Sequence, residues 1–120
     1  DSAITETFGV GGMAMIAAPA VTRFIGAGGF EDALETSDRM LEIVIDQNPN
    51  FIIPTWNFQG ICLGIDARKV VEKEITPVIN TGIAHKKAGY GQIGAGTVHP
   101  PLACFQKAIV AYAQKLKVRN

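Results

Sequence analysis

The sequence has no net charge, few cysteines and no long hydrophobic run. Eleven Lys and Arg residues balance eleven Asp and Glu residues among 120, so the formal net charge is zero. A protein that binds nucleic acid needs a concentrated basic field, and the only basic bias here lies in residues 107–119. Cations at that place are typical of the last turns of a solvated helix. We therefore expect no nucleic-acid partner.

Metal-binding and membrane signals are equally scarce. Cys62 and Cys104 are the only two cysteines, and they match neither a metal-ligand spacing nor a CxxC pattern. We expect both to be buried free thiols of a cytoplasmic protein. No stretch reaches the roughly 20 apolar residues that a membrane span requires, and no segment has the pattern of a signal peptide. Membrane association is therefore not expected.

Several motifs of known catalytic sites are also missing. The sequence contains no HExxH, GxSxG, EF-hand or paired-cysteine motif. We therefore expect neither metal catalysis nor a serine triad, and no cofactor.

The sequence does contain enough apolar residues for one core. Hydrophobic residues make up 48% of the chain, and the mean hydropathy is +0.20. A chain of this length is typical of a single domain, here residues 1–120, that buries roughly two-thirds of its unfolded surface. The apolar content is slightly above that of an ordinary globular domain, so some apolar surface is expected to face another chain or domain.

Small residues dominate the first part of the chain, over residues 9–29. This segment, GVGGMAMIAAPAVTRFIGAGG, predicts two short helices that meet at Pro19. Small side chains permit close backbone approach, so the segment is expected to be buried. Arg23, its only cation, is then expected to need a partner or a ligand. The apolar spacing that follows predicts a helix over residues 30–48, which Pro49 ends.

The second half carries extended and helical signals in turn. In order, we predict an extended segment over residues 51–58, a turn over 60–64, a helix over 67–74 with Asp66 as N-cap, a strand over 75–83, a loop or loop-strand over 85–96, and a long helix opened by Pro100 and Pro101. Regular alternation of strand and helix is missing. The sequence therefore predicts an α+β fold, with a small mixed sheet, flanking helices and a long C-terminal helix.

The strongest candidate for chemistry is the segment INTGIAHKKAGYGQIGAG, residues 79–96. A glycine-rich backbone can direct several N–H groups into one concavity that holds an anion. Lys86 and Lys87 would add positive charge, Thr81 a hydroxyl donor, and His85 an acid or a base near neutral pH. The spacing lacks the GK[ST] ending of a phosphate loop. A set of tight turns with exposed lysines is therefore the competing interpretation.

Other polar features have simpler interpretations. GIDARK, residues 64–69, is interpreted as a capped and solvated helix N-terminus. The N-terminal DSAITET, residues 1–7, is either an N-cap region or one wall of a site. His99, which precedes two prolines, is expected to mark the entry of a helix, and Trp56 is expected to anchor a core or an interface.

Five ordered segments resemble one protein family. They are DSAITETFG, APAVTRFIGAGG, LGIDARKVVE, ITPVINTGIAHK and GQIGAGTVHPPL. In this order they resemble the C-terminal part of YlbE-like proteins, a family of unknown function linked to FdrA-type proteins and to oxamate carbamoyltransferase. The resemblance covers nearly the whole chain and implies a C-terminal fragment of a larger subunit.

The resemblance implies carbamoyl transfer between carbamoyl phosphate and oxamate, which gives oxalurate and phosphate. Such a site binds a phosphate and a carboxylate, and it stabilises an oxyanion on the carbamoyl carbon. Matching side-chain chemistry to this requirement gives His85 for proton transfer, Lys86 for charge stabilisation and Thr81 as a hydroxyl donor. The further residues implied to bind the anionic substrate (phosphate, oxamate or oxalurate) are Arg23, Arg68, Asn80, Gly82, Gln92, Gly94 and Gly96.

The resemblance also implies partners, and it leaves alternatives open. FdrA-type and other subunits would form an oligomer with this chain, and the fragment alone would be inactive. Lys87 stands where the family usually has Glu, and His99 stands where Arg is common. If that Arg binds an anion, His99 makes the role weaker or pH dependent. The alternatives are a non-catalytic assembly or binding module, and an enzyme that acts on another small acid or an acyl-CoA.

Overall fold

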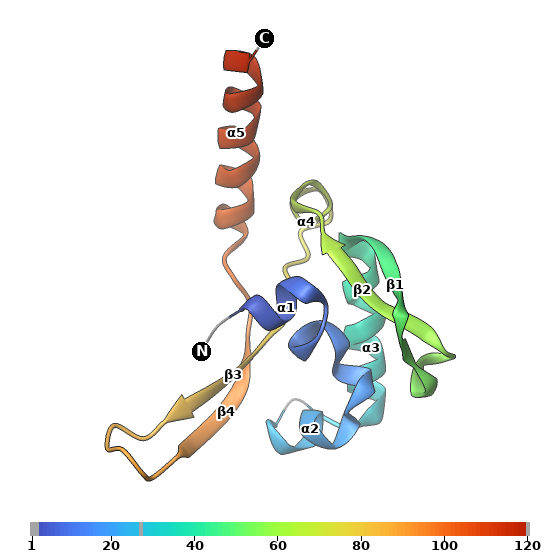
Figure 1. Ribbon diagram of the computed structural model, residues 1–120, viewed down its shortest axis with the longest axis vertical. Coiled ribbons are helices and arrows are strands. Elements are labelled where there is room, and N and C mark those ends of the chain that lie inside the picture. Colours follow the sequence, from blue (N-terminus) through green and yellow to red (C-terminus); the bar gives the residue numbers. More distant parts are fainter. Residues whose placement is uncertain (1–2, 27, 120) are drawn as a thin grey trace.

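The computed structural model describes residues 3–26 and 28–119, and it confirms the α+β class. The elements, with η for a short 3₁₀ helix, are α1 (Ile4–Phe8), η1 (Gly11–Ala17), α2 (Pro19–Phe24), α3 (Phe30–Met40), η2 (Leu41–Ile43), β1 (Val44–Ile53), η3 (Pro54–Trp56), β2 (Gln59–Ile65), α4 (Ala67–Lys73), β3 (Ile79–Ala84), β4 (Gln92–Val98) and α5 (Leu102–Arg119). Figure 1 shows a body of short helices and one hairpin, from which a second hairpin and α5 extend.

The strands form two separate antiparallel pairs in place of one small mixed sheet. In the first pair, β1 lies against β2 with a register shift between Asn48 and Ile52. Pro49 lies at this irregularity, where a proline, which has no N–H, interrupts the ladder least. In the second pair, β3 lies against β4 with a register shift after Ile83.

The helix predicted over residues 30–48 is shorter than expected. It ends at Met40, and after one turn of 3₁₀ helix the chain enters β1 at Val44. The β-branched side chains of Val44 and Ile45 suit a strand better than a helix. Pairing with β2, which lies far along the sequence, selects the strand here, so the apolar spacing alone gave the wrong end of the helix.

The turn predicted over residues 60–64 is also wrong, because these residues belong to β2. The chain reverses earlier, after η3, where Asn57 and Phe58 have φ of 52° and 57°. Gly60 lies where the two strands come close together, since a Cβ there would collide with the Asn48 carbonyl oxygen. A glycine in this strand therefore marks close backbone contact and not a turn.

The small-residue segment lies in the core only in part: residues 12–16 of η1 are buried, as predicted, whereas most of α2 is exposed, with Phe24 80% exposed. In η1, Met13 and Ile16 are fully buried, and η1 packs against α3 and the first hairpin. Trp56 of η3 is buried in the same core, and its Nε1 donates a hydrogen bond to Asp38 at 2.8 Å. The prediction that Trp56 anchors the core is confirmed.

Local signals fix the starts of the last two helices. Asp66 accepts a hydrogen bond from the backbone N–H of Arg68 at 2.9 Å and caps α4, as predicted. The long helix α5 begins directly after Pro100 and Pro101.

The two cysteines lie in different environments. Cys62 is buried in β2, whereas Cys104, in the first turn of α5, is exposed. The expectation that both thiols are buried is therefore wrong for Cys104. Among the described residues, Leu102 and Phe105, both partly buried, are the two of α5 that pack on the core, so neighbouring positions on this helix stay open to solvent.

The second hairpin and α5 extend away from the body (Figure 1). The radius of gyration is 16.1 Å, against about 14 Å for a compact domain of this length. The accessible surface is 7799 Å², against roughly 6,300 Å² expected from the mass. The chain therefore exposes more surface than a compact domain of its mass. Among the described residues, no helix is long and apolar enough to span a membrane.

Candidate functional site

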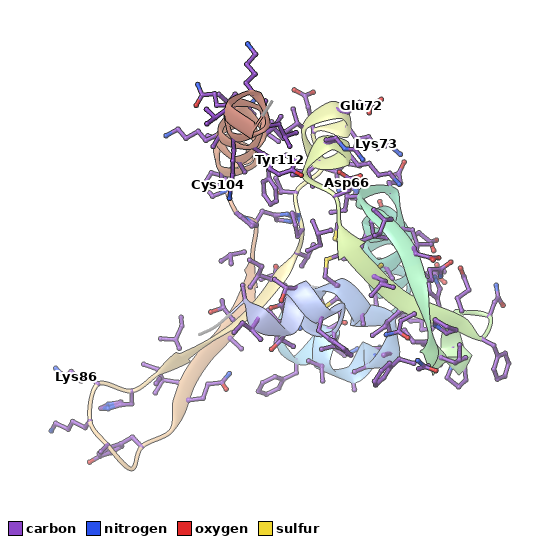
Figure 2. All side chains as sticks on the ribbon, turned by 45° about the horizontal axis from the view of Figure 1, so that its top comes forward. Asp66, Glu72, Lys73, Lys86, Cys104 and Tyr112 are labelled. Carbon is purple, nitrogen blue, oxygen red and sulfur yellow. The ribbon has the colours of Figure 1, made fainter. Side chains whose placement is uncertain are left out.

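One hairpin, β3–β4, carries most of the residues predicted to form the site. Its ladder pairs are Ile79–Val98, Asn80–Thr97, Thr81–Gly96, Gly82–Ala95, Ile83–Gly94 and Ala84–Gln92. His85 and Lys86 follow directly after β3. Figure 2 shows Lys86 at the outer end of the hairpin, pointing away from the body.

The predicted residues nevertheless divide between two places on this hairpin. Side chains alternate along a strand, so Asn80 and Thr81 point to opposite faces. The rise per residue places Asn80 and His85 about 16 Å apart along the strand. A substrate as small as oxamate cannot touch both residues. The hairpin therefore offers a tip, residues 85–91, and a base, at Asn80.

Local contacts hold the tip. The His85 ring stacks on Tyr90 with ring centroids 4.5 Å apart, and the backbone N–H of Lys87 donates to His85 Nδ1 at 2.9 Å. Because Nδ1 accepts this hydrogen bond, the neutral ring carries its proton on Nε2. The tip therefore presents one imidazole N–H donor beside the exposed side chain of Lys86.

The glycines of the hairpin serve two different purposes. Gly89 and Gly91 have φ of 88° and 74°, which confirms the tight-turn interpretation at the tip. Gly94 and Gly96 lie in the paired strand β4, where successive N–H groups alternate between the ladder and the free edge. The N–H groups of residues 91–96 therefore do not converge on one point.

Arg23 lies on α2, which borders this hairpin through Phe24. Its neighbour Phe24 lines a cleft of about 370 Å³ together with residues 92–95 of β4. Arg23 itself is exposed, so the expectation that a buried cation needs a partner there is wrong. The small side chains of residues 9–29 serve the packing of η1, which is buried, whereas α2 is exposed at Arg23.

Arg68 lies on another part of the molecule, in the first turn of α4. Its guanidinium pairs with Asp66 at 3.3 Å, and its side chain is 83% exposed. The hydrogen bond from this guanidinium, together with the backbone N–H, lowers the pKa of Asp66. The interpretation of GIDARK as a capped and solvated helix N-terminus is therefore confirmed.

At the base of the hairpin lies a buried carboxylate whose role the sequence did not reveal. Glu6 of α1 is only 3% exposed. Its Oε2 accepts hydrogen bonds from the backbone N–H of Gly12 at 2.8 Å and of Asn80 at 3.3 Å. Glu6 thus ties α1 to both η1 and β3. The sequence placed Glu6 in a polar N-terminal segment whose Asp1 and Ser2 lie outside the described residues.

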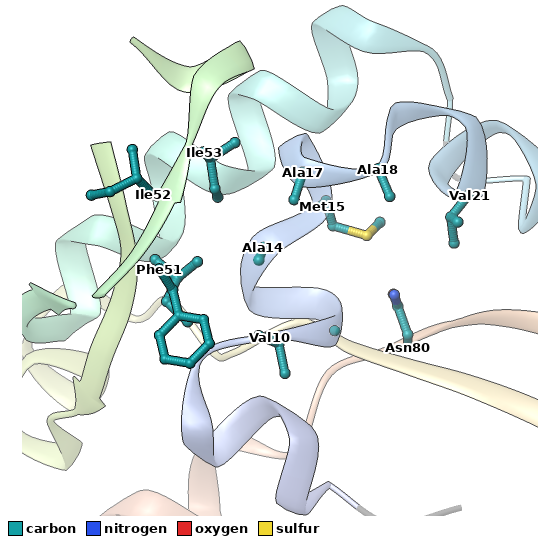
Figure 3. Close-up of a pocket in the computed structure, with 12 residues that line it drawn as sticks. Val10, Ala14, Met15, Ala17, Ala18, Val21, Phe51, Ile52, Ile53 and Asn80 are labelled. Atoms are coloured by element: carbon teal, nitrogen blue, oxygen red, sulfur yellow. The ribbon is translucent and has the colours of Figure 1, made fainter. Parts of the chain in front are cut away.

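Asn80 borders a cavity of about 400 Å³, here called the base cavity. Its lining residues are Val10, Gly11, Ala14, Met15, Ala17, Ala18, Val21, Phe51, Ile52, Ile53, Ile61 and Asn80. Figure 3 shows the Asn80 side chain reaching from β3 into this space, toward Met15 and Val21. Of the described residues that line the cavity, Asn80 is the one with a polar side chain, so among them it alone can orient a polar ligand group through a side chain.

His99 and a polar cleft lie on a further side of the hairpin. His99 precedes α5, as predicted, and its Nδ1 lies 3.0 Å from the Thr76 hydroxyl. With Asp32, Glu35 and Arg39 among others, His99 lines a cleft of about 220 Å³. Within the described part of the chain, no group of three or more His, Cys, Asp or Glu side chains could hold a metal ion.

No protein-family model matches this sequence. It is, however, 64% identical over 118 residues to the oxamate carbamoyltransferase subunit AllG of Escherichia coli K12, a match that covers 98% of this chain and 28% of that protein. The chain is thus similar to part of a carbamoyltransferase subunit. It is also 52% identical to the uncharacterized protein YahG of the same organism, over 98% of this chain and 25% of that protein.

A solved structure has the same fold. The crystal structure of a conserved protein of unknown function from Enterococcus faecalis V583 matches with a TM-score of 0.86 and 53% identity, over 95% of this chain and 27% of that one. The chain therefore spans about a quarter of the length of each of these relatives. The resemblance to YlbE-like proteins stays a prediction, whereas the similarity to a carbamoyltransferase subunit is a finding.

Proposed function

We propose that this chain is part of a subunit of a carbamoyltransferase that exchanges a carbamoyl group between carbamoyl phosphate and oxamate. The observation that carries the proposal is the 64% identity, over nearly the whole chain, to a protein named as an oxamate carbamoyltransferase subunit. Because the chain covers 28% of that protein, the proposed site is completed by other segments or subunits.

In the proposed reaction, the amide nitrogen of oxamate attacks the carbamoyl carbon. A C–N bond forms, the C–O bond to phosphate breaks, and the proton lost by the nitrogen leaves with the phosphate. The products are oxalurate and phosphate. The reverse reaction passes through the same transition state, with the same distribution of charge. Negative charge on the carbamoyl oxygen needs donors aimed at it in the transition state.

The hairpin tip is where this chain would supply such donors. His85 offers Nε2–H, because its Nδ1 accepts from Lys87 N, and Lys86 offers an exposed ammonium. In this arrangement His85 suits hydrogen-bond donation to an oxyanion. Proton transfer through Nδ1 requires the contact with Lys87 to open first. Thr81, the other residue proposed for catalysis, lies further down β3.

Most residues proposed to bind the anionic substrate lie on the same hairpin or on the helix beside it. Gly82, Gln92, Gly94 and Gly96 belong to its two strands, and Arg23 lies on the adjacent α2. Arg68, on α4, lies apart from them and is engaged by Asp66. We therefore assign Arg68 no contact with the substrate bound at the tip.

A second candidate is an assembly module that docks other subunits, including one of FdrA type. The unburied surface described above favours it. Large apolar side chains are exposed on the hairpin and on α5, such as Ile93 at 62%, Tyr112 at 61% and Val118 at 87%. A cleft of about 690 Å³ between α4 and α5 adds further apolar surface. Exposed apolar side chains beside an apolar cleft are typical of protein interfaces.

The experiment that separates the candidates uses His85→Ala in the assembled enzyme that contains this chain. We expect phosphate release from carbamoyl phosphate and oxamate to fall by about 100-fold or more, because a transition-state donor is lost. Light scattering of the same sample should show an intact assembly. Lys107→Ala, an exposed cation on α5, is the matched control and should leave turnover unchanged.

Two outcomes would count against the catalytic role. Unchanged turnover by the His85→Ala assembly would mean that the chemistry lies on other segments. Loss of assembly, with normal turnover in whatever complex remains, would assign the hairpin tip to docking.

A further inference from the structure

Two buried oxygen atoms at the base of the hairpin have no hydrogen-bond donor among the described residues. They are Glu6 Oε1 and Asn80 Oδ1. The two residues are in direct contact, because the backbone N–H of Asn80 donates to Glu6 Oε2 at 3.3 Å. Buried acceptors are nearly always paired, since leaving one unpaired carries a large desolvation cost. Two unpaired acceptors on neighbouring residues therefore call for one shared explanation.

The chemistry of the two side chains supplies that explanation. A carboxylate can only accept hydrogen bonds, whereas a carboxamide has one end that accepts and one that donates. If the Asn80 carboxamide is rotated by half a turn, its Nδ2 takes the buried position of Oδ1 and becomes a donor available to Glu6 Oε1. The oxygen of Asn80 then takes the place of the nitrogen, which Figure 3 shows on the side of the base cavity. The two ends of the group have nearly the same shape, so the rotation leaves the packing unchanged.

The environment of Glu6 favours this orientation. Its carboxylate lies between Asn80 and Gly11, both of which line the base cavity, and a Cβ at Gly11 would collide with Glu6 Oε2. Oε2 is already occupied by Gly12 N at 2.8 Å. Two backbone hydrogen bonds to Oε2, from Gly12 N and Asn80 N, thus hold the Glu6 carboxylate in place beside Asn80, whose carboxamide offers a donor for Oε1.

We propose that Glu6 is a positioning residue that fixes the Asn80 carboxamide with its oxygen toward the base cavity, and that this cavity binds a small ligand through a primary amide N–H. The remaining lining is apolar, and a largely apolar cavity with one oriented polar group is typical of small-molecule sites. A carboxylate of the same shape would place a negative oxygen against an acceptor, so the cavity selects amides against carboxylates.

This inference stands on the cavity and goes beyond the proposed function. It also reverses the sequence-based expectation that Asn80 binds an anion, because an outward oxygen accepts and cannot donate. If carbamoyl transfer is the activity, the amide end of oxamate or of the carbamoyl group is the part that Asn80 would read.

The first test compares two probes of nearly equal shape, isobutyramide and isobutyrate, by NMR titration of the 120-residue chain. We expect isobutyramide to bind at least about tenfold more tightly, and to shift the signals of the Asn80 side-chain amide. Equal or tighter binding of isobutyrate would overturn the proposal, because the Asn80 nitrogen would then face the cavity. Absence of binding by both probes would overturn it as well.

The second test changes the residue that sets the orientation. Glu6→Gln keeps an acceptor for Gly12 N but adds a donor, so Asn80 can then adopt either orientation. We expect the preference for isobutyramide to fall to about twofold or less. Glu72→Gln, on the exposed face of α4, removes the same charge elsewhere and should leave the preference unchanged. Full selectivity in Glu6→Gln would show that Glu6 does not orient Asn80.

A measurement on the unmodified chain covers the case in which Glu6→Gln does not fold. The Asn80 Nδ2 protons, held by Glu6, should exchange with solvent at least about tenfold more slowly than those of the exposed Asn50. Equal exchange rates would contradict the proposed hydrogen bond. Failure of carbamoyl transfer in the assembled enzyme would leave both results untouched, so the two proposals can fail separately.

Discussion

At the scale of single residues, the tightest positions are two glycines near the N-terminus. A Cβ at Gly12 would collide with the Val78 carbonyl oxygen, and a Cβ at Gly9 would collide with the Cys62 carbonyl oxygen. Both neighbours are backbone atoms, which cannot rotate away as a side chain can. The small residues of this segment therefore meet a packing requirement at two separate contacts.

Gly12→Ala tests this packing. We expect the free energy of unfolding to fall by about 1–3 kcal/mol, because the backbone near Val78 must shift to admit the methyl group. Urea denaturation followed by circular dichroism measures the change. Gly96→Ala is the matched control, since no atom lies within 4 Å of a Cβ there. Equal destabilisation by both substitutions would contradict the packing argument.

The buried thiol of Cys62 makes the free energy of unfolding depend on pH in the alkaline range. Burial raises the pKa of the Cys62 thiol from 9.0 to about 11. The folded state therefore holds this proton more tightly than the unfolded state. Its contribution is fully present below pH 9 and is lost as the pH rises toward 11.

We expect the free energy of unfolding to fall by roughly 2 kcal/mol across that pH window, and Cys62→Ala to remove this part of the dependence. Urea denaturation at several pH values measures it. Cys104→Ala, which changes the exposed thiol, should retain the full dependence. A Cys62→Ala variant with the same pH profile as the unmodified chain would refute the assignment.

At the scale of elements, α4 shows a helix start that depends on one side chain. Asp66 accepts from Arg68 N at 2.9 Å, and the contacts with Arg68 lower the pKa of Asp66 below its ordinary value of 3.8. A carboxyl group whose pKa is lowered in the folded state stabilises the fold at pH values above its ordinary pKa. This contribution is lost as the pH falls below it.

Asp66→Ala should lower the free energy of unfolding by about 1 kcal/mol at neutral pH, because the cap of α4 is lost. Asp66→Ser keeps an oxygen that can cap the helix and should recover most of the loss. Chemical denaturation at pH 7 and at pH 3 measures both variants, and the difference between Asp66 and Ala should shrink at the lower pH. Equal stability of the Ala and Ser variants would show that the cap contributes nothing.

β1 shows where element prediction from the sequence failed. Residues 41–48 continue the apolar spacing of α3, and Pro49 is a normal helix stop. The structure nevertheless places Val44 in a ladder with Ile65. The pairing energy comes from residues about 20 positions later in the chain. No local rule contains that information, so the misplaced end of α3 and the missed strand have one cause.

At the scale of the whole molecule, the chain consists of a packed body and two extensions. The β3–β4 hairpin packs on the body through its base, near η1, and α5 packs mainly on α4. Both extensions therefore have fewer buried apolar contacts than the body. Local stability follows the density of such contacts.

Hydrogen exchange should reveal this difference. In the isolated chain, we expect amides at the hairpin tip and in the second half of α5 to exchange at least about tenfold faster than those of α3 and β2. Mass spectrometry of peptic fragments measures the rates. Protection of both extensions in an assembled complex would support the docking proposal. Uniform exchange over the isolated chain would contradict the division into body and extensions.

The segment that carries the candidate site could be recognised from the sequence, but the long-range contact at its base could not. The segment over residues 79–96 brought Asn80, His85 and Lys86 to attention through their chemistry and the nearby glycines. The strand period then places Asn80 and His85 too far apart for one small ligand. The sequence placed Glu6 in a segment expected to be an N-cap region or one wall of a site, but its burial and its contact with Asn80, 74 positions later in the chain, have no local signal.

The sequence by itself determined the features that depend on a few neighbouring residues. The cap at Asp66, the start of α5 after Pro100 and Pro101, and the burial of the small residues of η1 follow from local hydrogen bonding, fixed φ and side-chain size. Only the tertiary structure decided that β1 is a strand, that the strands form two hairpins, and that Glu6 faces Asn80. Those outcomes depend on contacts between residues far apart in the chain, whose energies no local pattern carries.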